Sequence, residues 1–208
     1  DNIYFARAAL KIGKDDFMAG LDRLGFNQKL PFEISVAESQ YSNADRIETE
    51  IQLADSGYGQ GQVLVNPVHL ASLYTMYPNR GKVLKPYLVY KDTPEPEVWI
   101  EDACTPETAE IVEDGMKAVI SSEHGTGHAA MRSDITLAGK TGTAEIKASK
   151  EDTSGTELGW FAVYTADADM QKPVLMVSMV EDVKNAGGSG LVVRKAKAVL
   201  DSYIPPVQ

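Results

Sequence analysis

Residues 138–145 of the chain have the sequence Ala-Gly-Lys-Thr-Gly-Thr-Ala-Glu, and the interpretation of the whole chain starts from this stretch. Gly-Lys-Thr also occurs in P-loops, which bind nucleotide phosphates. A P-loop needs a further glycine five residues before its Gly-Lys-Thr glycine, and Asp134 occupies that place. A P-loop also leads into a helix, whereas residues 143–146 have the pattern of a strand. A P-loop is therefore excluded.

The composition excludes several other classes of protein. The 208 residues are 43% hydrophobic, which suits one sizeable domain or part of a larger one. The net charge of −10 argues against a general binder of nucleic acids or anionic lipids. A single cysteine, Cys104, allows neither an internal disulfide nor a zinc site of several thiolates. The apolar run at residues 174–180 is too short to span a bilayer, and the opening at Asp1 leads us to expect a longer natural protein.

The periodicity of apolar residues predicts an α+β fold in which helices come first and a sheet follows. We expect helices from residue 3 to 12, over about 17–24, from 67 to 77 and from 106 to 120, with residues 31–50 mostly in a loop. Asn66-Pro67 and Thr105-Pro106 each combine a helix cap with proline at the first helical position. Strands at 135–146, 158–165 and 173–183 should form a three-stranded antiparallel sheet, followed by a closing C-terminal helix.

Two helices have apolar residues at helical spacing, which predicts their buried faces. For the helix after Thr105 the expected buried residues are Ile111, Val112, Met116, Val119 and Ile120. For the last helix they are Val192, Val193, Ala196, Val199 and Leu200.

Five segments together resemble the transpeptidase domain of penicillin-binding proteins. They are the Lys-Thr-Gly at 140–142, the Gly-Gln-Gly stretch and Pro-led helix within 56–68, the Gly-Thr-Gly-x-x-Ala loop at 125–130, the Gly-Trp-Phe at 159–161, and the opening residues 1–6, which look like the end of a Ser-Asp-Asn motif. Their order and spacing cover nearly the whole chain. In detail they look most like class B proteins of the low-affinity, methicillin-resistance type from Gram-positive bacteria.

The resemblance implies the penicillin-binding protein and serine β-lactamase fold, with residues 1–208 as the C-terminal portion of a single transpeptidase domain. The family's nucleophile lies in a Ser-x-x-Lys motif upstream of Ser-x-Asn, and no serine of this chain has lysine three residues later. We therefore expect the nucleophile-bearing part to precede Asp1. We also expect that these 208 residues alone are not acylated by a penicillin and do not turn over substrate.

The resemblance also assigns roles to the residues of the motif. Lys140 would act in the proton network beside the catalytic serine and attract a carboxylate. Thr141 and Thr143 would bind the terminal carboxylate of the substrate through their hydroxyls, and the backbone N–H of Thr143 would form half of an oxyanion hole. Gly142 would leave room for a peptide to lie along the strand as an added strand. Asn2 would contact the substrate amide.

Some side chains near these motifs leave alternatives open. Glu145 either lines the groove or faces solvent. Residues 147–157 form either the rim of the cleft or a surface hairpin. His124 and His128 flank a glycine-rich loop but have no obvious carboxylate partner, so we predict no metal site. Cys104 is expected to be a small packed residue without a lowered pKa.

For the parent protein, the resemblance implies cross-linking of peptidoglycan by serine acyl transfer at D-Ala-D-Ala and trapping by β-lactams. A β-lactam sensor domain and a D,D-carboxypeptidase share the scaffold and remain alternatives. No cofactor is needed. The expected partners are stem peptides, β-lactams and the cell-wall synthesis machinery, with no nucleic acid. The parent would be anchored in the cell membrane with this domain outside, and the isolated chain would self-associate through an open sheet edge.

Overall fold

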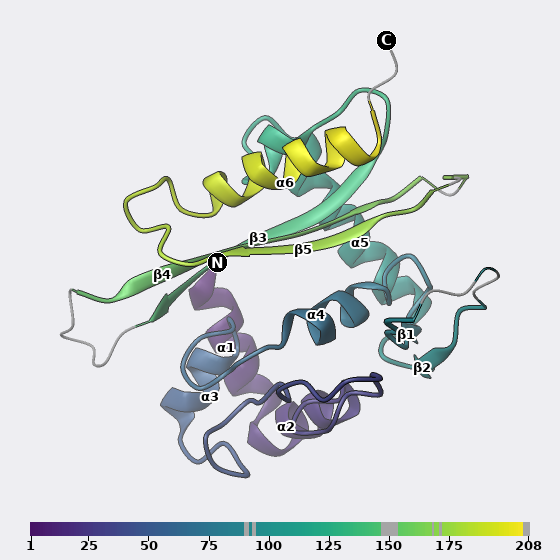
Figure 1. Cartoon of the computed structure of the whole chain (residues 1–208). Coiled ribbons are helices and arrows are strands. Elements are labelled where there is room, and N and C mark those ends of the chain that lie inside the picture. The colour runs from purple at the N-terminus through teal and green to yellow at the C-terminus, as the bar shows by residue number, and fades with distance from the viewer. Residues whose placement is uncertain (90–91, 93–94, 147–153, 168, 171, 206–208) are drawn as a thin grey trace. The chain divides into compact units, whose positions relative to one another are not determined.

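The computed structural model describes residues 1–89, 92, 95–146, 154–167, 169–170 and 172–205. The chain divides into two compact units, Asp1–Cys104 and Thr105–Gln208, and each is presented by itself (Figure 1). Within the described ranges no helix combines the length and the hydrophobicity that crossing a membrane requires. Residues 147–153, which belong to the loop predicted at 147–157, lie outside the described part.

The first unit contains the predicted N-terminal helices and a small two-stranded sheet. The helix predicted from residue 3 to 12 is present, and Gly13 separates it from the second helix, as expected. The two short strands were not predicted, and they pair in antiparallel fashion. The elements are α1 (Asn2–Ile12), α2 (Lys14–Arg23), α3 (Glu50–Ser56), α4 (Pro67–Tyr74), β1 (Val83–Leu84) and β2 (Val98–Ile100).

Helix α3 was not predicted either, although its N-terminus has a recognisable cap. The hydroxyl of Thr49 accepts a hydrogen bond from the backbone N–H of Gln52 at 3.1 Å. The side chain of Gln52 in turn accepts from the backbone N–H of Glu48 at 3.0 Å. A threonine followed three residues later by glutamine is a helix-start signal, but a helix of only seven residues is too short to show a clear apolar period beside it.

Helix α4 begins where the sequence predicts and ends three residues early. The side chain of Asn66 caps it by accepting from the N–H of Val68 at 2.8 Å, and Pro67 takes the first helical position. The helix was expected to reach Tyr77 but ends at Tyr74. The chain tightens there into i→i+3 turns, because the hydroxyl of Thr75 accepts from Leu84 N at 2.8 Å and draws this end toward β1.

A buried histidine joins three segments of the first unit. His69 of α4 is fully buried. Its Nε2 lies 2.8 Å from the carbonyl oxygen of Leu24, and its Nδ1 lies 2.7 Å from the hydroxyl of Ser39. A carbonyl can only accept, so Nε2 carries the proton and Nδ1 accepts from Ser39. The rings of Phe26 and Trp99 pack against the imidazole, at centroid distances of 5.2 and 5.4 Å.

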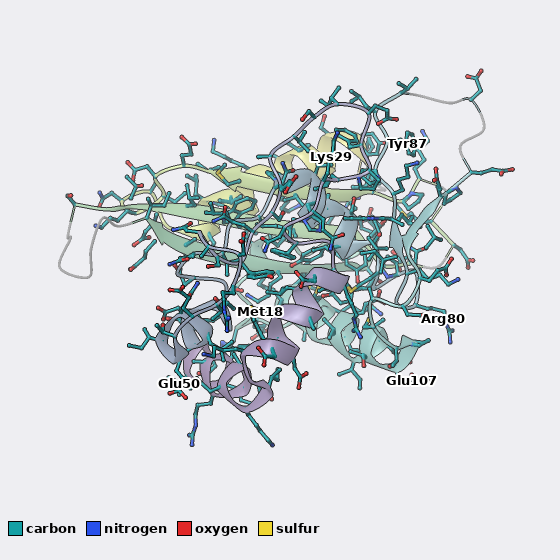
Figure 2. The ribbon with its side chains drawn as sticks, turned by 90° about the horizontal axis from the view of Figure 1, so that it is seen from below. Met18, Lys29, Glu50, Arg80, Tyr87 and Glu107 are labelled. Carbon is teal, nitrogen blue, oxygen red and sulfur yellow. The ribbon has the colours of Figure 1, made fainter. Side chains whose placement is uncertain are left out.

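The rest of this unit is held by an apolar core to which α1, α3, α4 and β1 contribute side chains. Its buried members include Phe26, Ile47, Leu53 and Val83. Met18, labelled in Figure 2, packs against this core, and its sulfur accepts a hydrogen bond from the N–H of Ile47 at 3.1 Å. The loop after α2 is therefore fixed to the helices rather than free of them.

The second unit has the predicted order of helix, three strands and helix. The meander prediction is confirmed, because the strand order is β3-β4-β5 with both pairs antiparallel. In Figure 1, α6 lies along one face of this sheet. The elements are α5 (Pro106–Ser121), the short 3₁₀ turn η1 (His128–Ala130), β3 (Leu137–Ile146), β4 (Thr156–Thr165), β5 (Leu175–Val180) and α6 (Ser189–Tyr203).

The core of the second unit lies between the sheet and α6, and it corrects part of the predicted faces. Phe161 and Val163 of β4 are fully buried against Val192 and Val193 of α6. Val199, predicted to share that helix face, is 57% exposed. On α5, Met116 and Ile120 are buried as predicted, but Ile111 is 72% exposed and Val112 is 36% exposed.

Both errors have the same physical cause. Apolar side chains at helical spacing show that a face exists, but its centre depends on what packs against the helix. On α5 the inward side runs through Ala109 and Met116 and includes Glu113, which accepts a hydrogen bond from the hydroxyl of Tyr164 at 2.9 Å. A polar residue on the inward side moves the buried face away from Ile111.

Arg132 ties the segment before β3 to the end of α6. Its side chain is 2% exposed and forms a two-pronged ion pair with Asp134. One terminal nitrogen also lies 3.4 Å from Asp201 and donates to the carbonyl oxygen of Ile204. Asp134, followed by Asp201, holds the pKa of Arg132 above its usual range, and the buried cation stays charged.

Candidate active site

The residues predicted from the Lys-Thr-Gly motif lie together on β3. Among the described residues this strand is an edge of the sheet, since β4 is its only paired neighbour. Lys140, Thr141, Gly142, Thr143 and Glu145 follow one another along it. The site is therefore one exposed strand edge.

The pairing pattern determines which backbone groups of β3 point away from the sheet. The N–H of Ala166 donates to the carbonyl of Thr136, so these two residues face each other across the ladder. In an antiparallel pair, every second residue directs its backbone N–H and C=O at the partner strand. The residues between them direct theirs away from it. Lys140 and Gly142 lie an even number of residues from Thr136, so their backbone groups bond β4. The N–H of Thr143 therefore points outward, as an oxyanion-hole donor must.

A second ladder leads to the same conclusion. The N–H of Thr165 donates to the carbonyl of Val174, so the backbone N–H and C=O of Thr165 point toward the β5 side of β4. Trp160 and Ala162, an odd number of residues away, must then face β3, and they are the register partners of Gly142 and Lys140. The two ladders agree on the outward direction of Thr143.

Side chains on β3 alternate between the two faces, which separates Lys140 from the threonines. Thr141 and Thr143 share the face of Phe161, the partner of Thr141 on β4, while Lys140 starts from the opposite face. Thr141 is 6% exposed, whereas Thr143 is exposed. The three predicted contacts thus do not form one row of side chains.

The ammonium group of Lys140 nevertheless reaches the outer edge. Its Nζ donates to the backbone carbonyl of Thr141 at 2.6 Å. Thr141 is one of the residues whose carbonyl points away from β4, so the positive charge lies beside the outward N–H of Thr143. Partial burial lowers the pKa of Lys140, because desolvation disfavours the ammonium form. A lowered pKa makes the ammonium group a better proton donor than an ordinary lysine.

The structure adds one residue that the motif assignment did not include. The hydroxyl of Thr126, in the Gly-Thr-Gly loop at 125–130, lies 2.7 Å from the hydroxyl of Thr141. The sequence shows the loop and the strand as separate motifs fifteen residues apart, and spacing alone gives no contact between them. Only the fold brings them together.

Packing within the sheet does not explain why residue 142 is glycine. A Cβ added at Gly139 would lie 2.7 Å from the carbonyl oxygen of Ala162, so the sheet requires glycine there. A Cβ at Gly142 would meet its nearest neighbour, the Cβ of Trp160, at 3.4 Å, which is an ordinary contact. The bare backbone at Gly142 is consistent with a strand edge that a peptide approaches.

The remaining candidate residues lie outside this edge or at its end. Asn2 belongs to the first unit, where it is the first residue of α1 and is exposed. Glu145 is exposed opposite Glu157, and its part in substrate binding stays a prediction. The ring of His128 bonds the carbonyl of Ile120 at 3.0 Å. Within the described residues no group of three or more His, Cys, Asp or Glu is arranged to hold a metal ion.

Cys104 behaves as a packed residue. It is half-buried beside the core of the first unit. Desolvation raises the pKa of its thiol, which disfavours the nucleophilic thiolate, as the sequence led us to expect.

An edge strand with Lys-Thr-Gly, a lysine of lowered pKa and an outward N–H defines a class of protein that acts by acyl transfer on peptides or β-lactams. The family comparison agrees. The chain belongs to the penicillin-binding protein transpeptidase domain family, whose model matches residues 1–201. This confirms the family and the fold predicted from the sequence. The finer assignment to the methicillin-resistance type stays a prediction.

Several curated relatives match almost the whole chain. The chain is 43% identical over 202 residues to penicillin-binding protein 3 of Bacillus subtilis, covering 97% of this chain and 30% of that protein. It is 29% identical to the peptidoglycan D,D-transpeptidase MrdA of Haemophilus influenzae, covering 97% of this chain and 34% of that protein. The chain thus spans about a third of the length of each.

Solved structures show the same fold. The D,D-transpeptidase domain of a peptidoglycan glycosyltransferase from Eggerthella lenta matches with a TM-score of 0.74 at 25% identity, covering 98% of this chain and 51% of that one. The imipenem acyl-enzyme complex of penicillin-binding protein A from M. tuberculosis matches with a TM-score of 0.75 at 21% identity, covering 96% of this chain and 44% of that one.

Proposed function

We propose that this chain is the Lys-Thr-Gly-bearing part of a serine D,D-transpeptidase domain that cross-links peptidoglycan stem peptides and is acylated by β-lactams. The observation that carries the proposal is the edge of β3, where the outward N–H of Thr143 lies beside the ammonium of Lys140. The nucleophilic serine belongs to the remainder of the parent protein, since no Ser-x-x-Lys occurs in residues 1–208.

In this proposal the donor peptide lies along the outer edge of β3 as an added strand. Thr143 N–H donates to the carbonyl oxygen of the scissile D-Ala-D-Ala bond and stabilises the negative charge that develops when the serine attacks. The hydroxyls of Thr141 and Thr143 bind the terminal carboxylate. D-Ala leaves with a proton, and an amino group of a second stem peptide then attacks the ester and releases the serine.

Lys140 supplies charge and proton exchange at the same edge. Its ammonium attracts the substrate carboxylate, and its lowered pKa suits a group that passes protons between the serine and the leaving amine. A bound peptide strand needs the Thr141 carbonyl as an acceptor, so the Lys140 ammonium would leave that carbonyl as the peptide binds. Asn2 would contact the substrate amide.

The test is covalent labelling of the full-length parent by a fluorescent penicillin, followed by denaturing electrophoresis. The parent is expected to label, and Lys140→Ala is expected to slow labelling by about 100-fold or more. Lys195→Ala is the matched control, because Lys195 is exposed on α6, away from the motif, and should label at the normal rate. An unlabelled parent, or equal rates in all three proteins, contradicts the proposal. The 208 residues alone should give no covalent band.

The proposal extends to the setting of the parent. It would be held at the cell membrane with this domain outside, among the proteins of cell-wall synthesis. The isolated 208-residue chain would self-associate, because β5 ends the described sheet and its six residues, Leu-Met-Val-Ser-Met-Val, carry no charge that opposes edge pairing. Light scattering that shows only monomers across a range of concentrations would exclude self-association.

A further inference from the structure

The hydroxyl pair of Thr126 and Thr141 raises a question of direction. Either oxygen can be the donor across their 2.7 Å contact. A threonine hydroxyl has one proton to donate. If Thr141 donates to Thr126, it has no proton left for a carboxylate. If Thr126 donates, the proton of Thr141 is available to a ligand.

The position of Thr126 is fixed by the end of α5. The N–H of Gly127 donates to the carbonyl of Val119 at 3.0 Å, and the ring of His128 bonds the backbone carbonyl of Ile120. These contacts satisfy carbonyls of the last helical turn, which otherwise lack partners. A Cβ at Gly125 would lie 2.1 Å from Val119 O, so the backbone at Gly125 packs directly against the end of α5 and only glycine fits there. Thr126 is therefore held by the residues on both sides of it.

We propose that Thr126 is a positioning residue for the carboxylate site: its hydroxyl donates to Thr141 Oγ1 and so directs the proton of Thr141 to the ligand. The inference rests on the proposed function. Thr126 is exposed, and water can supply donors to its own oxygen. Thr141 is nearly buried, so its oxygen depends on a protein donor. In a chain of donors, each hydrogen bond strengthens the next.

The test compares acylation rates of the full-length parent by a penicillin and by its methyl ester, which lacks the carboxylate. Thr126→Val, which keeps the shape and removes the hydroxyl, should lower the rate with the free acid about 3- to 10-fold, the effect of one neutral hydrogen bond. The rate with the ester should stay unchanged. Thr126→Ser restores the hydroxyl and should restore the rate with the acid. Thr136→Val, at an exposed threonine just before β3, is the matched control and should change neither rate.

Each other result has a definite meaning. If Thr126→Val slows acid and ester equally, Thr126 only supports the loop, and the inference is wrong. If the variant accelerates acylation by the acid, Thr141 is the donor of the pair, and the inference is also wrong. If the unmodified parent reacts with neither compound, the proposed function fails and the inference fails with it.

Discussion

Protonation of His69 should make the stability of the first unit depend on pH. The imidazole is fully buried, and both of its nitrogens are hydrogen-bonded. Burial lowers its pKa below the usual 6.5, although the bond to the Leu24 carbonyl opposes this. A proton on Nδ1 would also remove the acceptor that Ser39 uses. The folded unit therefore resists a proton that the unfolded chain accepts.

The direction of the effect follows from proton binding. Above pH 6.5 both states are mostly neutral at this ring, and the full stability is present. Below 6.5 the unfolded state binds more protons than the folded state, so the free energy of unfolding decreases as the pH falls toward the lowered pKa of the folded state. The limiting slope is about 1.4 kcal/mol per pH unit. Between pH 6.5 and 5.5 the loss should approach about 1 kcal/mol.

Urea unfolding at pH 7.5, 6.5 and 5.5 measures this loss. Trp99 packs against His69 and reports on the first unit, and Trp160→Phe removes the other tryptophan. His69→Gln should abolish the dependence between pH 6.5 and 5.5, whatever its overall stability. His124→Gln, at an exposed histidine of the second unit, should keep it. A wild-type stability that is equal at 6.5 and 5.5, or a slope that survives in His69→Gln, would refute the reasoning.

Three substitutions in the second unit test its packing and its buried charge by thermal or urea unfolding. Gly159→Ala should destabilise by about 1–3 kcal/mol, because its Cβ would lie 2.7 Å from a methyl of Val192. Gly115→Ala in α5 is the matched control and should stabilise by about 0.5–1 kcal/mol, since nothing lies within 4 Å of the added methyl; equal effects of the two would contradict the packing. Arg132→Met should cost about 3 kcal/mol, because Asp134 loses its buried cation; a loss below 1 kcal/mol would show that this ion pair does not hold the segment.

The sheet was predictable because its signals are local. Alternating side chains define a strand wherever one side is buried, and short polar connections favour neighbours that run antiparallel. The helix starts at Pro67 and Pro106 were predictable for the same reason, since a cap acts within one turn. Thr105, for example, accepts from the N–H of Thr108 at 3.2 Å. These signals are complete within a few neighbouring residues, so the sequence alone predicts the strands and the helix starts.

The errors concern contacts between distant segments. Ile111 and Val199 fit their helical patterns, and only the partners of α5 and α6 exclude them from the core. The site shows the same limit. The motif identified Lys140 and the threonines. The outward turn of the Thr143 N–H depends on the register with β4, and the approach of Thr126 depends on how its loop closes on α5.

The contacts of Arg132 with Asp134, Asp201 and Ile204 show where the second unit can safely be shortened. The family model stops at residue 201, but the guanidinium is also held by the backbone oxygen of Ile204. A version cut back to residue 200 would lose both that oxygen and Asp201. The buried guanidinium would then keep only Asp134 as a partner, just before the strand that carries the motif. Expression boundaries for this region should therefore run past residue 204.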